Sequence, residues 1–348
     1  MLDMRKLSSF VFIAVLLLVA CGGDGDNSNV DKMSNVDKML FTWVDEKHNI
    51  FTMNSDGTNV KQLTANSKGS YRPSFSPNGE RILFRRVPNN SKESEVFTIN
   101  TDGGELKQVT DLYGENGNAE WSPDGKQILF ENFNYEESET DIYLIDVDGT
   151  NLKKLTDDNF SNFNAQLSPD GKKFLFNSNR DFQDEGIDLF VKNIDGTGLR
   201  QMTTGLRVWH IANWSPDGKQ IVFNASKEGL DEIYVINSDG TDLRKLANGY
   251  NVWNEARWSP DGEKILFTSD ISASNEIYVI NSDGTDLRQL TNGYDVWRDV
   301  HWSPDGSQIV FMSTRYDESR QQPSILTMDS DGSNIVILEQ DGVVVEWR

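Results

Sequence analysis

The feature that most constrains the fold is a turn sequence that recurs along the chain. Ser-Pro-Asp-Gly, with Asn replacing Asp in the first copy, begins at residues 76, 122, 168, 215, 259 and 303, at intervals of 46, 46, 47, 44 and 44. An Asp-Gly pair occurs seven times at similar intervals, from 56–57 to 331–332. The length of 348 residues alone would suggest about two domains. Because the Ser-Pro-Asp-Gly and Asp-Gly motifs recur with the same spacing, they indicate instead a single repeat array.

Each repeat unit predicts four short strands. In residues 256–291 these are ARWS, KILFT, EIYVIN and LRQLT. The Ser-Pro-Asp-Gly segment fits a type I turn, because Pro presets φ at the second position and Gly tolerates a positive φ at the fourth. The segment 281–285 (NSDGT) fits a Gly-closed hairpin. A four-stranded unit with this period predicts a blade of a β-propeller.

The two ends of the array predict how the ring closes. The first unit has MLFT at 39–42, which aligns with ILFT at 265–268, but no Ser-Pro turn precedes it. In the C-terminal GVVVEWR, Val345 and Trp347 align with Val300 and Trp302. The C-terminal strand should therefore complete blade one, which removes the free sheet edges. We predict an all-β, seven-bladed β-propeller of four-stranded blades over 39–348, and a monomer.

The first 38 residues differ from the array. Residues 1–20 carry Arg5 and Lys6 before an apolar run from Phe10 to Ala20, which fits a signal peptide and is short for a membrane span. The sequence LVAC at 18–21 resembles the lipobox of bacterial lipoproteins, which implies that Cys21 is lipidated. A simple secretory signal is the alternative. Residues 21–38, rich in Gly, Asp, Asn and Ser, predict a flexible tether.

Charge and cysteine content exclude several classes of partner and site. With 33 basic and 55 acidic residues the formal net charge is −22, which disfavours nucleic acid and anionic membrane surfaces. We expect contact with the membrane only through the lipid anchor. The single cysteine excludes a disulfide scaffold and a multi-cysteine zinc site.

The tryptophans fall into two main classes. The position before each Ser-Pro turn holds a large residue, as packing between blades requires: Phe75, Trp121, Leu167, Trp214, Trp258 and Trp302, with Trp347 as the seventh. Trp209, Trp253 and Trp297 lie five residues before that position, only in blades five to seven. Blades two to four have Ser70, Asn116 and Asn162 there. Three rings on adjacent loops indicate an interaction site. The alternative is that they cover the blade ends.

The loops expected on the same face are acidic. They contain Asp45, Glu46, Glu93, Glu95, Glu136, Glu137, Glu139, Asp181, Asp184, Glu185, Glu228 and Asp317. A partner should then be neutral or cationic, unless the acids only confer solubility. The candidate partner-binding residues are Trp209, His210, Trp253, Asn254, Trp297 and Arg298.

Sequence motifs of catalysis are missing. The chain contains no G-x-S-x-G, P-loop or H-E-x-x-H sequence, so we predict no catalytic residue and no cofactor. The segment 146–149 (DVDG) fits a hairpin better than a calcium loop. His48, His210 and His301 should lie on or near the tryptophan-bearing face, without metal-ligand spacing. We predict no metal site, and a histidine site in the propeller funnel is the alternative.

The repeat resembles a known family. The unit W-S-P-D-G-K-x-I-x-F … I-Y-x-x-x-x-D-G-T-x-L-x-x-L-T occurs nearly verbatim at 121–156, 214–246 and 258–291, and more loosely at 75–110, 167–203 and 302–338. It resembles the TolB-type (WD40-like) propeller repeat. The resemblance implies this fold and includes envelope proteins that bind protein partners at the propeller mouth. The unit is also similar to the propellers of prolyl-oligopeptidase-type enzymes and oligogalacturonate lyases.

These observations together predict a lipoprotein of the bacterial cell envelope, in the periplasm, at the outer membrane or on the cell surface. It is expected to act as a binding module for a protein or peptide rather than as an enzyme. An envelope enzyme similar to oligogalacturonate lyase is one alternative. Glycan binding without catalysis is the other, because tryptophan rings also stack on sugars.

Overall fold

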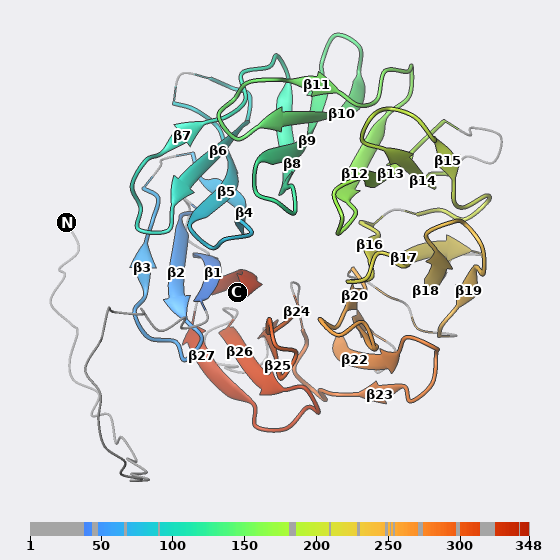
Figure 1. Cartoon of the computed structure of the whole chain (residues 1–348). Coiled ribbons are helices and arrows are strands. Elements are labelled where there is room, and N and C mark those ends of the chain that lie inside the picture. The colour runs from blue at the N-terminus through green and yellow to red at the C-terminus, as the bar shows by residue number, and fades with distance from the viewer. Residues whose placement is uncertain are drawn as a thin grey trace, which may run out of the picture. The chain divides into compact units, whose positions relative to one another are not determined.

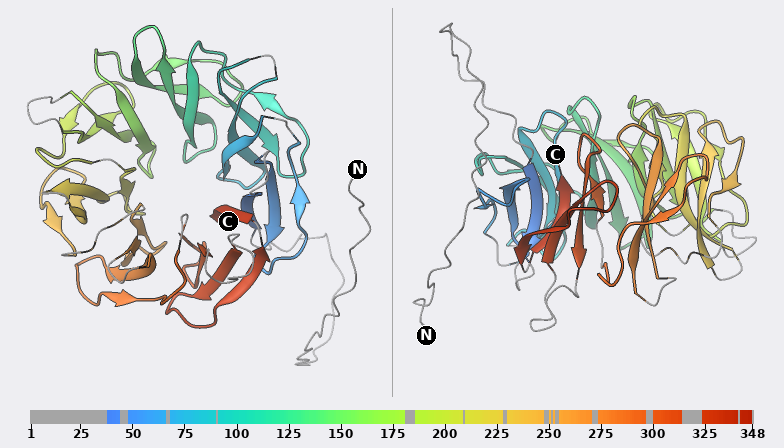
Figure 2. Two further views of the ribbon diagram at one scale, coloured as in Figure 1. Left: turned by 180° about the vertical axis from the view of Figure 1, so that it is seen from behind. Right: turned by 90° about the horizontal axis from the view of Figure 1, so that it is seen from below.

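The computed structural model describes residues 38–347 apart from 44–47, 66–67, 90, 181–185, 209, 228–229, 248–249, 251, 253–254, 271–273, 297–299, 314–323 and 341. The described residues form seven four-stranded antiparallel sheets arranged around a ring (Figures 1 and 2). The predicted seven-bladed β-propeller is confirmed. Within this part of the chain, no helix has the length and apolarity that a membrane crossing requires.

The strands of each blade are named A to D from the innermost to the outermost. Blade 1 contains β28 (Gly342–Trp347), β1 (Lys38–Trp43), β2 (Ile50–Asn54) and β3 (Lys61–Gln62). Blade 2 contains β4 (Ser70–Phe75), β5 (Arg81–Arg86), β6 (Glu95–Asn100) and β7 (Lys107–Gln108). Blade 3 contains β8 (Glu115–Trp121), β9 (Gln127–Asn134), β10 (Glu139–Asp146) and β11 (Lys153–Lys154). Blade 4 contains β12 (Asn162–Leu167), β13 (Lys173–Ser178), β14 (Asp188–Asn193) and β15 (Arg200–Gln201).

The last three blades have short innermost strands. Blade 5 contains β16 (Asn213–Trp214), β17 (Gln220–Lys227), β18 (Leu230–Asn237) and β19 (Arg244–Lys245). Blade 6 contains β20 (Arg257–Trp258), β21 (Lys264–Ser269), β22 (Glu276–Asn281) and β23 (Arg288–Gln289). Blade 7 contains β24 (His301–Trp302), β25 (Gln308–Ser313), β26 (Ser324–Asp329) and β27 (Val336–Gln340). The A–B and C–D turns lie on one face, here called the turn face. The B–C and D–A connections lie on the other, called the connection face.

The Ser-Pro-Asp-Gly turns close by their own side chains and then pack on one another. In blade 3, Ser122 Oγ donates to Asp124 Oδ1 at 2.7 Å, and the Gly125 N–H donates to the Ser122 carbonyl at 2.8 Å. Gly125 has a φ of +69°, as the turn prediction requires. A Cβ on Gly125 would stand 3.4 Å from Cδ of Pro77 in the preceding blade. The motif is therefore both a turn and a contact between blades.

The C-terminal strand closes the ring. In β28, Trp347 stands opposite Met39 of β1, just as Trp258 stands opposite Ile265 and Trp302 opposite Ile309. The red C-terminal strand lies beside the blue β1 in Figure 1. The alignment of GVVVEWR with strand A is confirmed, so blade 1 combines the two ends of the array.

The tryptophans before the Ser-Pro turns pack between blades, as predicted. Trp258 of blade 6 is 9% exposed and packs in one cluster with Val222 and Ile233 of blade 5. Its indole N–H donates to the Asn213 carbonyl of blade 5 at 3.1 Å. Trp121 makes the same contact with the Ser74 carbonyl at 3.3 Å. Trp121 and Trp258 therefore bind the preceding blade by apolar burial and by a hydrogen bond, whereas the buried indole N–H of Trp302 has no partner among the described residues.

The outermost strands of blades 1 to 6 are shorter than predicted. The segment LRQLT at 287–291 has ladder pairing only at Arg288 and Gln289. The chain then turns inward: the Leu290 N–H donates to the Ile277 carbonyl at 2.8 Å, and Thr291 Oγ1 accepts the Ile277 N–H at 2.9 Å. The threonine hydroxyl ends the strand by taking the place of a ladder partner.

Candidate functional site in the central channel

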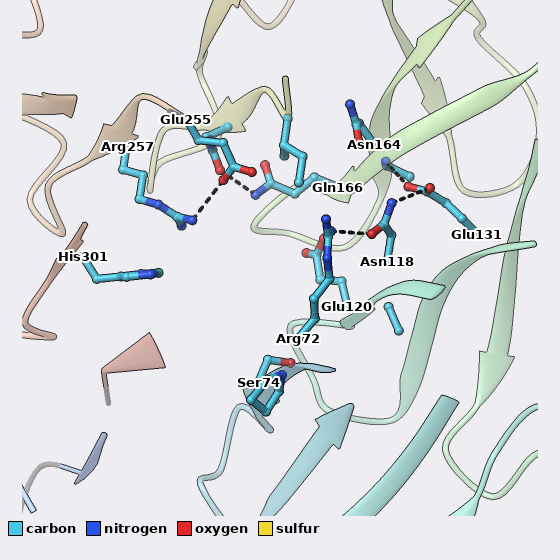
Figure 3. A pocket seen from close by; sticks show the side chains of 15 residues that line it. Arg72, Ser74, Asn118, Glu120, Glu131, Asn164, Gln166, Glu255, Arg257 and His301 are labelled. Atoms are coloured by element: carbon cyan, nitrogen blue, oxygen red, sulfur yellow. Dashed lines mark hydrogen bonds and ion pairs between the residues drawn. The ribbon is translucent and has the colours of Figure 1, made fainter. Parts of the chain in front are cut away.

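A cavity of about 510 Å³ opens at the centre of the ring and is the candidate site (Figure 3). It is lined by residues of blades 2 to 7: Arg72, Pro73, Ser74, Asn118, Ala119, Glu120, Glu131, Asn164, Ala165, Gln166, Ile211, Asn213, Glu255, Arg257 and His301. All of them except Glu131 belong to the innermost strands or to the connections that lead into those strands. The polar character of this lining makes the channel suited to a charged or hydrogen-bonding ligand.

One register of strand A supplies a polar side chain from each of these blades. The residue two positions before the Ser-Pro serine lines the cavity in every case: Ser74, Glu120, Gln166, Asn213, Arg257 and His301. The neighbouring residue at each of these positions is the large packing residue described above. This alternation could have revealed the channel residues in the sequence, because successive strand residues point to different sides.

Bulges in blades 2 to 4 turn a second set of side chains toward the cavity. Arg72, Asn118 and Asn164 have positive φ values of 51°, 44° and 54°. The pairing of strands A and B shifts register around each of them. Bulges commonly re-aim side chains next to binding sites, and positive φ at non-glycine residues costs about 1–3 kcal/mol.

The first of these residues begins a hydrogen-bonded chain across three blades. Arg72 of blade 2 donates through its guanidinium to Asn118 Oδ1 of blade 3. Asn118 Nδ2 donates to Glu131 Oε2 at 2.7 Å, and the Ala165 N–H of blade 4 donates to Glu131 Oε1 at 3.1 Å. Burial nevertheless raises the pKa of Glu131 to about 7, because these donors and Arg72 offset only part of the lost hydration.

A second chain joins blades 4, 5 and 6. Gln166 Nε2 donates to Asn213 Oδ1 at 3.0 Å, and Asn213 Nδ2 donates to the Ala256 carbonyl at 3.0 Å. Next to it, Arg257 and Glu255 form an ion pair at 2.9 Å. These bonds occupy the polar groups on this side of the cavity and hold adjacent blades together.

Glu120 and His301 stand apart from both chains. Within the described residues, the Glu120 carboxylate accepts only the Leu167 N–H, at a long 3.4 Å, and burial raises its pKa to about 8. His301 Nε2 is buried without a hydrogen-bond partner in the described part of the chain. Burial, followed by the charge of Arg257, holds the pKa of His301 well below 6.5, so the ring is neutral. Figure 3 shows His301 and Glu120 pointing into the cavity from different sides.

In blades 2 and 3, the connection into strand A bonds to the preceding blade through the same sequence position. The Ser70 N–H donates to the His48 carbonyl of blade 1 at 2.9 Å, and the Asn116 N–H donates to the Ser94 carbonyl of blade 2 at 3.0 Å. Ser70 and Asn116 are both fully buried. They occupy the sequence position that Trp209, Trp253 and Trp297 hold in the later blades.

In blades 5 to 7 the equivalent bond is made one residue earlier in the sequence. The donors are three valines: Val208 bonds to Ile187 (2.8 Å), Val252 to Asp231 (3.0 Å) and Val296 to Asn275 (2.6 Å). These valines are at most 1% exposed. The buried place is thus taken by the residue that precedes each tryptophan. A slip of one residue exchanges the faces of a strand.

Most of the predicted partner-binding residues lie outside the described residues. These are Trp209, Trp253, Asn254, Trp297 and Arg298, and the predicted lipidation site Cys21 also lies outside them. His210 is half-buried, and its carbonyl accepts Asn177 Nδ2 at 3.2 Å.

The other two histidines occupy different places. His48 lies at the connection face against Tyr71, with ring centroids 5.1 Å apart, whereas His301 lines the channel. The predicted hairpin at 146–149 is present, since Asp148 Oδ1 accepts the Thr150 N–H at 2.9 Å.

The acidic loops are only partly described, and one of their members is buried. Glu136 and Glu137 are exposed in the β9–β10 connection. Glu95 is 5% exposed, and its carboxylate accepts bonds from Thr110 Oγ1 and Asn116 Nδ2. Burial raises the pKa of Glu95 to about 7. Glu95 therefore belongs to the interior and not to an acidic rim.

Two exposed tyrosines lie on the connection face of blade 3. Tyr113 and Tyr135 are 56% and 46% exposed, with ring centroids 6.2 Å apart. The Tyr135 hydroxyl donates to Glu115 Oε1 at 2.8 Å, which fixes the ring. This pair was not identified in the sequence, because its members come from two different loops.

Comparisons with known proteins agree with this architecture. The family model described as the TolB beta propeller domain matches residues 31–205 and 181–343. Among curated proteins, none matches this chain in sequence. A putative TolB from Agrobacterium tumefaciens is 24% identical, with a TM-score of 0.53, and the alignment covers 71% of this chain and 94% of that one.

Two enzyme structures share the fold. An oligogalacturonate lyase from Vibrio parahaemolyticus is 14% identical, with a TM-score of 0.64, and the alignment covers 88% of this chain and 85% of that one. A puromycin-hydrolyzing peptidase from Mycobacterium tuberculosis is 14% identical, with a TM-score of 0.66, over 89% of this chain and 52% of that one. At such identities the likeness concerns the fold alone. The family match spans nearly all of the repeat array, and the chain belongs to the TolB beta-propeller family.

Proposed function

We propose that this chain is a lipid-anchored binding module of the bacterial cell envelope that takes a protein or peptide segment at the mouth of its channel. The observation that carries the proposal is the register slip in blades 5 to 7, where the N–H that bonds to the preceding blade comes from the residue one position earlier than in blades 2 and 3. Val208, Val252 and Val296 fill the buried place there. That buried place does not require the tryptophans that follow the valines, and large aromatic residues on adjacent loops favour recognition.

The test compares two triple variants of the full chain. Replacing Trp209, Trp253 and Trp297 together with alanine should abolish capture of the partner from envelope extracts and leave the melting temperature nearly unchanged. Replacing Val208, Val252 and Val296 with alanine should cost about 1–3 kcal/mol per site in stability. If the tryptophan variant loses as much stability as the valine variant, the rings are packing residues and the proposal is wrong.

The lipid anchor rests on the sequence LVAC at 18–21. We expect mass spectrometry of the protein purified from membranes to find an acylated N-terminal Cys21. A Cys21→Ala variant should remain unprocessed and carry no lipid. Recovery of an unmodified mature protein in the soluble envelope fraction would instead support a simple secretory signal.

The second candidate is a polysaccharide lyase that acts in the channel. Its supporting observation is that Arg72, Arg257 and His301 line one cavity, as a site for an acidic sugar would require. Incubation with oligogalacturonate, with and without added divalent metal, would produce an unsaturated uronate if the chain were such an enzyme. We expect no product.

A further inference from the structure

The two arginines of the channel already have protein partners. Arg257 is paired with Glu255 at 2.9 Å. Arg72 donates to Asn118, and its charge also lowers the pKa of Glu131. An anionic ligand would have to compete with these contacts, because a charge taken from water needs its own partner.

Glu120 is the acidic group of the cavity that has no cation. Its neighbours at the same register, Ser74 and Gln166, are uncharged. Its hydrogen bond from the Leu167 N–H is long, at 3.4 Å, and no bond from a cationic side chain joins it within the described residues. His301, which also lines the cavity, has a buried Nε2 without a partner in the same part of the chain. Among the described residues that line the channel, the polar groups with weak or missing partners are thus the Glu120 carboxyl, the neutral His301 imidazole and the buried Ser74 hydroxyl, and only the first can carry a negative charge.

We propose that the channel receives one cationic side chain, a lysine or an arginine, from the bound polypeptide, and that Glu120 is its partner. This inference rests on the proposed binding function and names the chemistry of the ligand. A cation bound beside Glu120 gains a charge-assisted hydrogen bond in a cavity of low dielectric.

The remaining charged groups that face the cavity leave Glu120 as the partner of the cation. Arg72, Glu131, Glu255 and Arg257 are bonded to one another or to amides, as described above. Glu346 of β28 stands at the register equivalent to Glu120, since it is the residue before Trp347.

Ligand binding should depend on pH in a defined direction. Burial raises the pKa of Glu120 to about 8, so the free protein carries a protonated Glu120 at neutral pH. A cation binds the ionised form, and binding therefore releases a proton. The affinity for a cation should increase roughly ten-fold per pH unit from pH 6 to about pH 8 and then level off.

The direct test measures the titration of Glu120 by NMR of ¹³C-labelled glutamate carboxyl groups in the full chain. n-Butylammonium chloride serves as the probe, with n-butanol and sodium chloride as neutral and ionic-strength controls. We expect saturating n-butylammonium to lower the pKa of Glu120 by about one unit or more, and the controls to leave it unchanged. An unchanged Glu120 titration with n-butylammonium would overturn the inference.

A peptide experiment then connects this site to the proposed function. Two glycine-serine peptides that differ only in a central lysine or norleucine are titrated into the wild type, Glu120→Gln and the matched control Glu263→Gln. Glu263 is an exposed acid on the turn face, so its variant loses the same charge away from the channel. We expect wild type and Glu263→Gln to prefer the lysine peptide at least ten-fold, and Glu120→Gln to lose this preference.

The outcomes separate the inference from the proposed function. If both peptides bind equally and depend on the three tryptophans, the binding module stands and the cation site is wrong. If neither peptide binds but n-butylammonium shifts the Glu120 titration, the cation site stands and a peptide is the wrong ligand.

Discussion

In most blades, one threonine hydroxyl donates a hydrogen bond to a buried carboxylate. In blade 6, Thr291 Oγ1 accepts the Ile277 N–H at 2.9 Å and donates to Glu276 Oε2 at 2.7 Å. The same donation to a carboxylate recurs in Thr110 to Glu95, Thr156 to Asp141 and Thr203 to Asp188. Blade 5 has Ala247 at this position, and its Glu232 pairs with Lys245 at 3.2 Å instead. The threonine that ends the outermost strand in these blades is therefore also the hydrogen-bond partner of a buried acid.

This arrangement predicts the effect of removing one hydroxyl. Thr291→Val should lower the free energy of unfolding by about 1–3 kcal/mol, because Glu276 and the Ile277 N–H each lose a buried partner. Thr291→Ser keeps the hydroxyl and should retain most of the stability. Chemical denaturation of both variants checks this, and equal losses would show that the methyl group matters instead.

The raised pKa of Glu131 predicts a pH dependence of stability. Its folded pKa of about 7 exceeds its ordinary value of 4.5, so its stabilising contribution is full below about pH 4.5 and lost as the pH rises through 7. The difference in unfolding free energy between wild type and Glu131→Gln should therefore change by up to about 3 kcal/mol between pH 4.5 and pH 8. Denaturation at several pH values measures this difference, and a constant value would contradict the prediction.

Among the structural elements, the Ser-Pro-Asp-Gly turns join neighbouring blades. Gly125→Ala should cost about 1–2 kcal/mol, because alanine would have to adopt the positive φ of +69°. Gly186→Ala is the matched control: Gly186 has no positive φ, and nothing lies within 4 Å of its Cβ position. Chemical denaturation should find a loss in the first variant only.

The sequence predicts elements well where one position has one structural role. Turn chemistry, the large residue before it and the alternation of strand B recur in every copy, so strand order and ring closure follow. The register slip at Val208, Val252 and Val296 could not be predicted, because each Ser-Pro serine follows the position equivalent to Thr291 by the same number of residues in every copy. Whether the valine or the residue after it fills the buried place depends on packing against the preceding blade.

The channel illustrates the same limit for the candidate site. The polar positions Glu120, Arg257 and His301 could have been found by alternation from the packing residues. The isolation of Glu120 could not be predicted, since it depends on contacts across several blades. The sequence-based site therefore rested on the tryptophans, and the unpaired carboxyl emerged only from the structure.

At the scale of the whole molecule, closure depends on the segment that pairs with β1. Deleting residues 342–348 should expose the inner edge of β1 and replace one cooperative thermal transition with a broader one at lower temperature. A synthetic peptide of residues 341–348, added in excess, should restore part of the loss. Calorimetry checks both results, and an unchanged transition would mean that β28 contributes little to the ring.

The register slip also has a consequence for how a partner approaches. A ring of equal blades would present the same surface after each rotation by one blade, and a ligand could dock in seven equivalent ways. Blades 2 to 4 carry bulged inner strands, whereas blades 5 to 7 carry short ones preceded by buried valines. The two groups of blades therefore differ, so the channel does not present seven equivalent docking positions to a ligand.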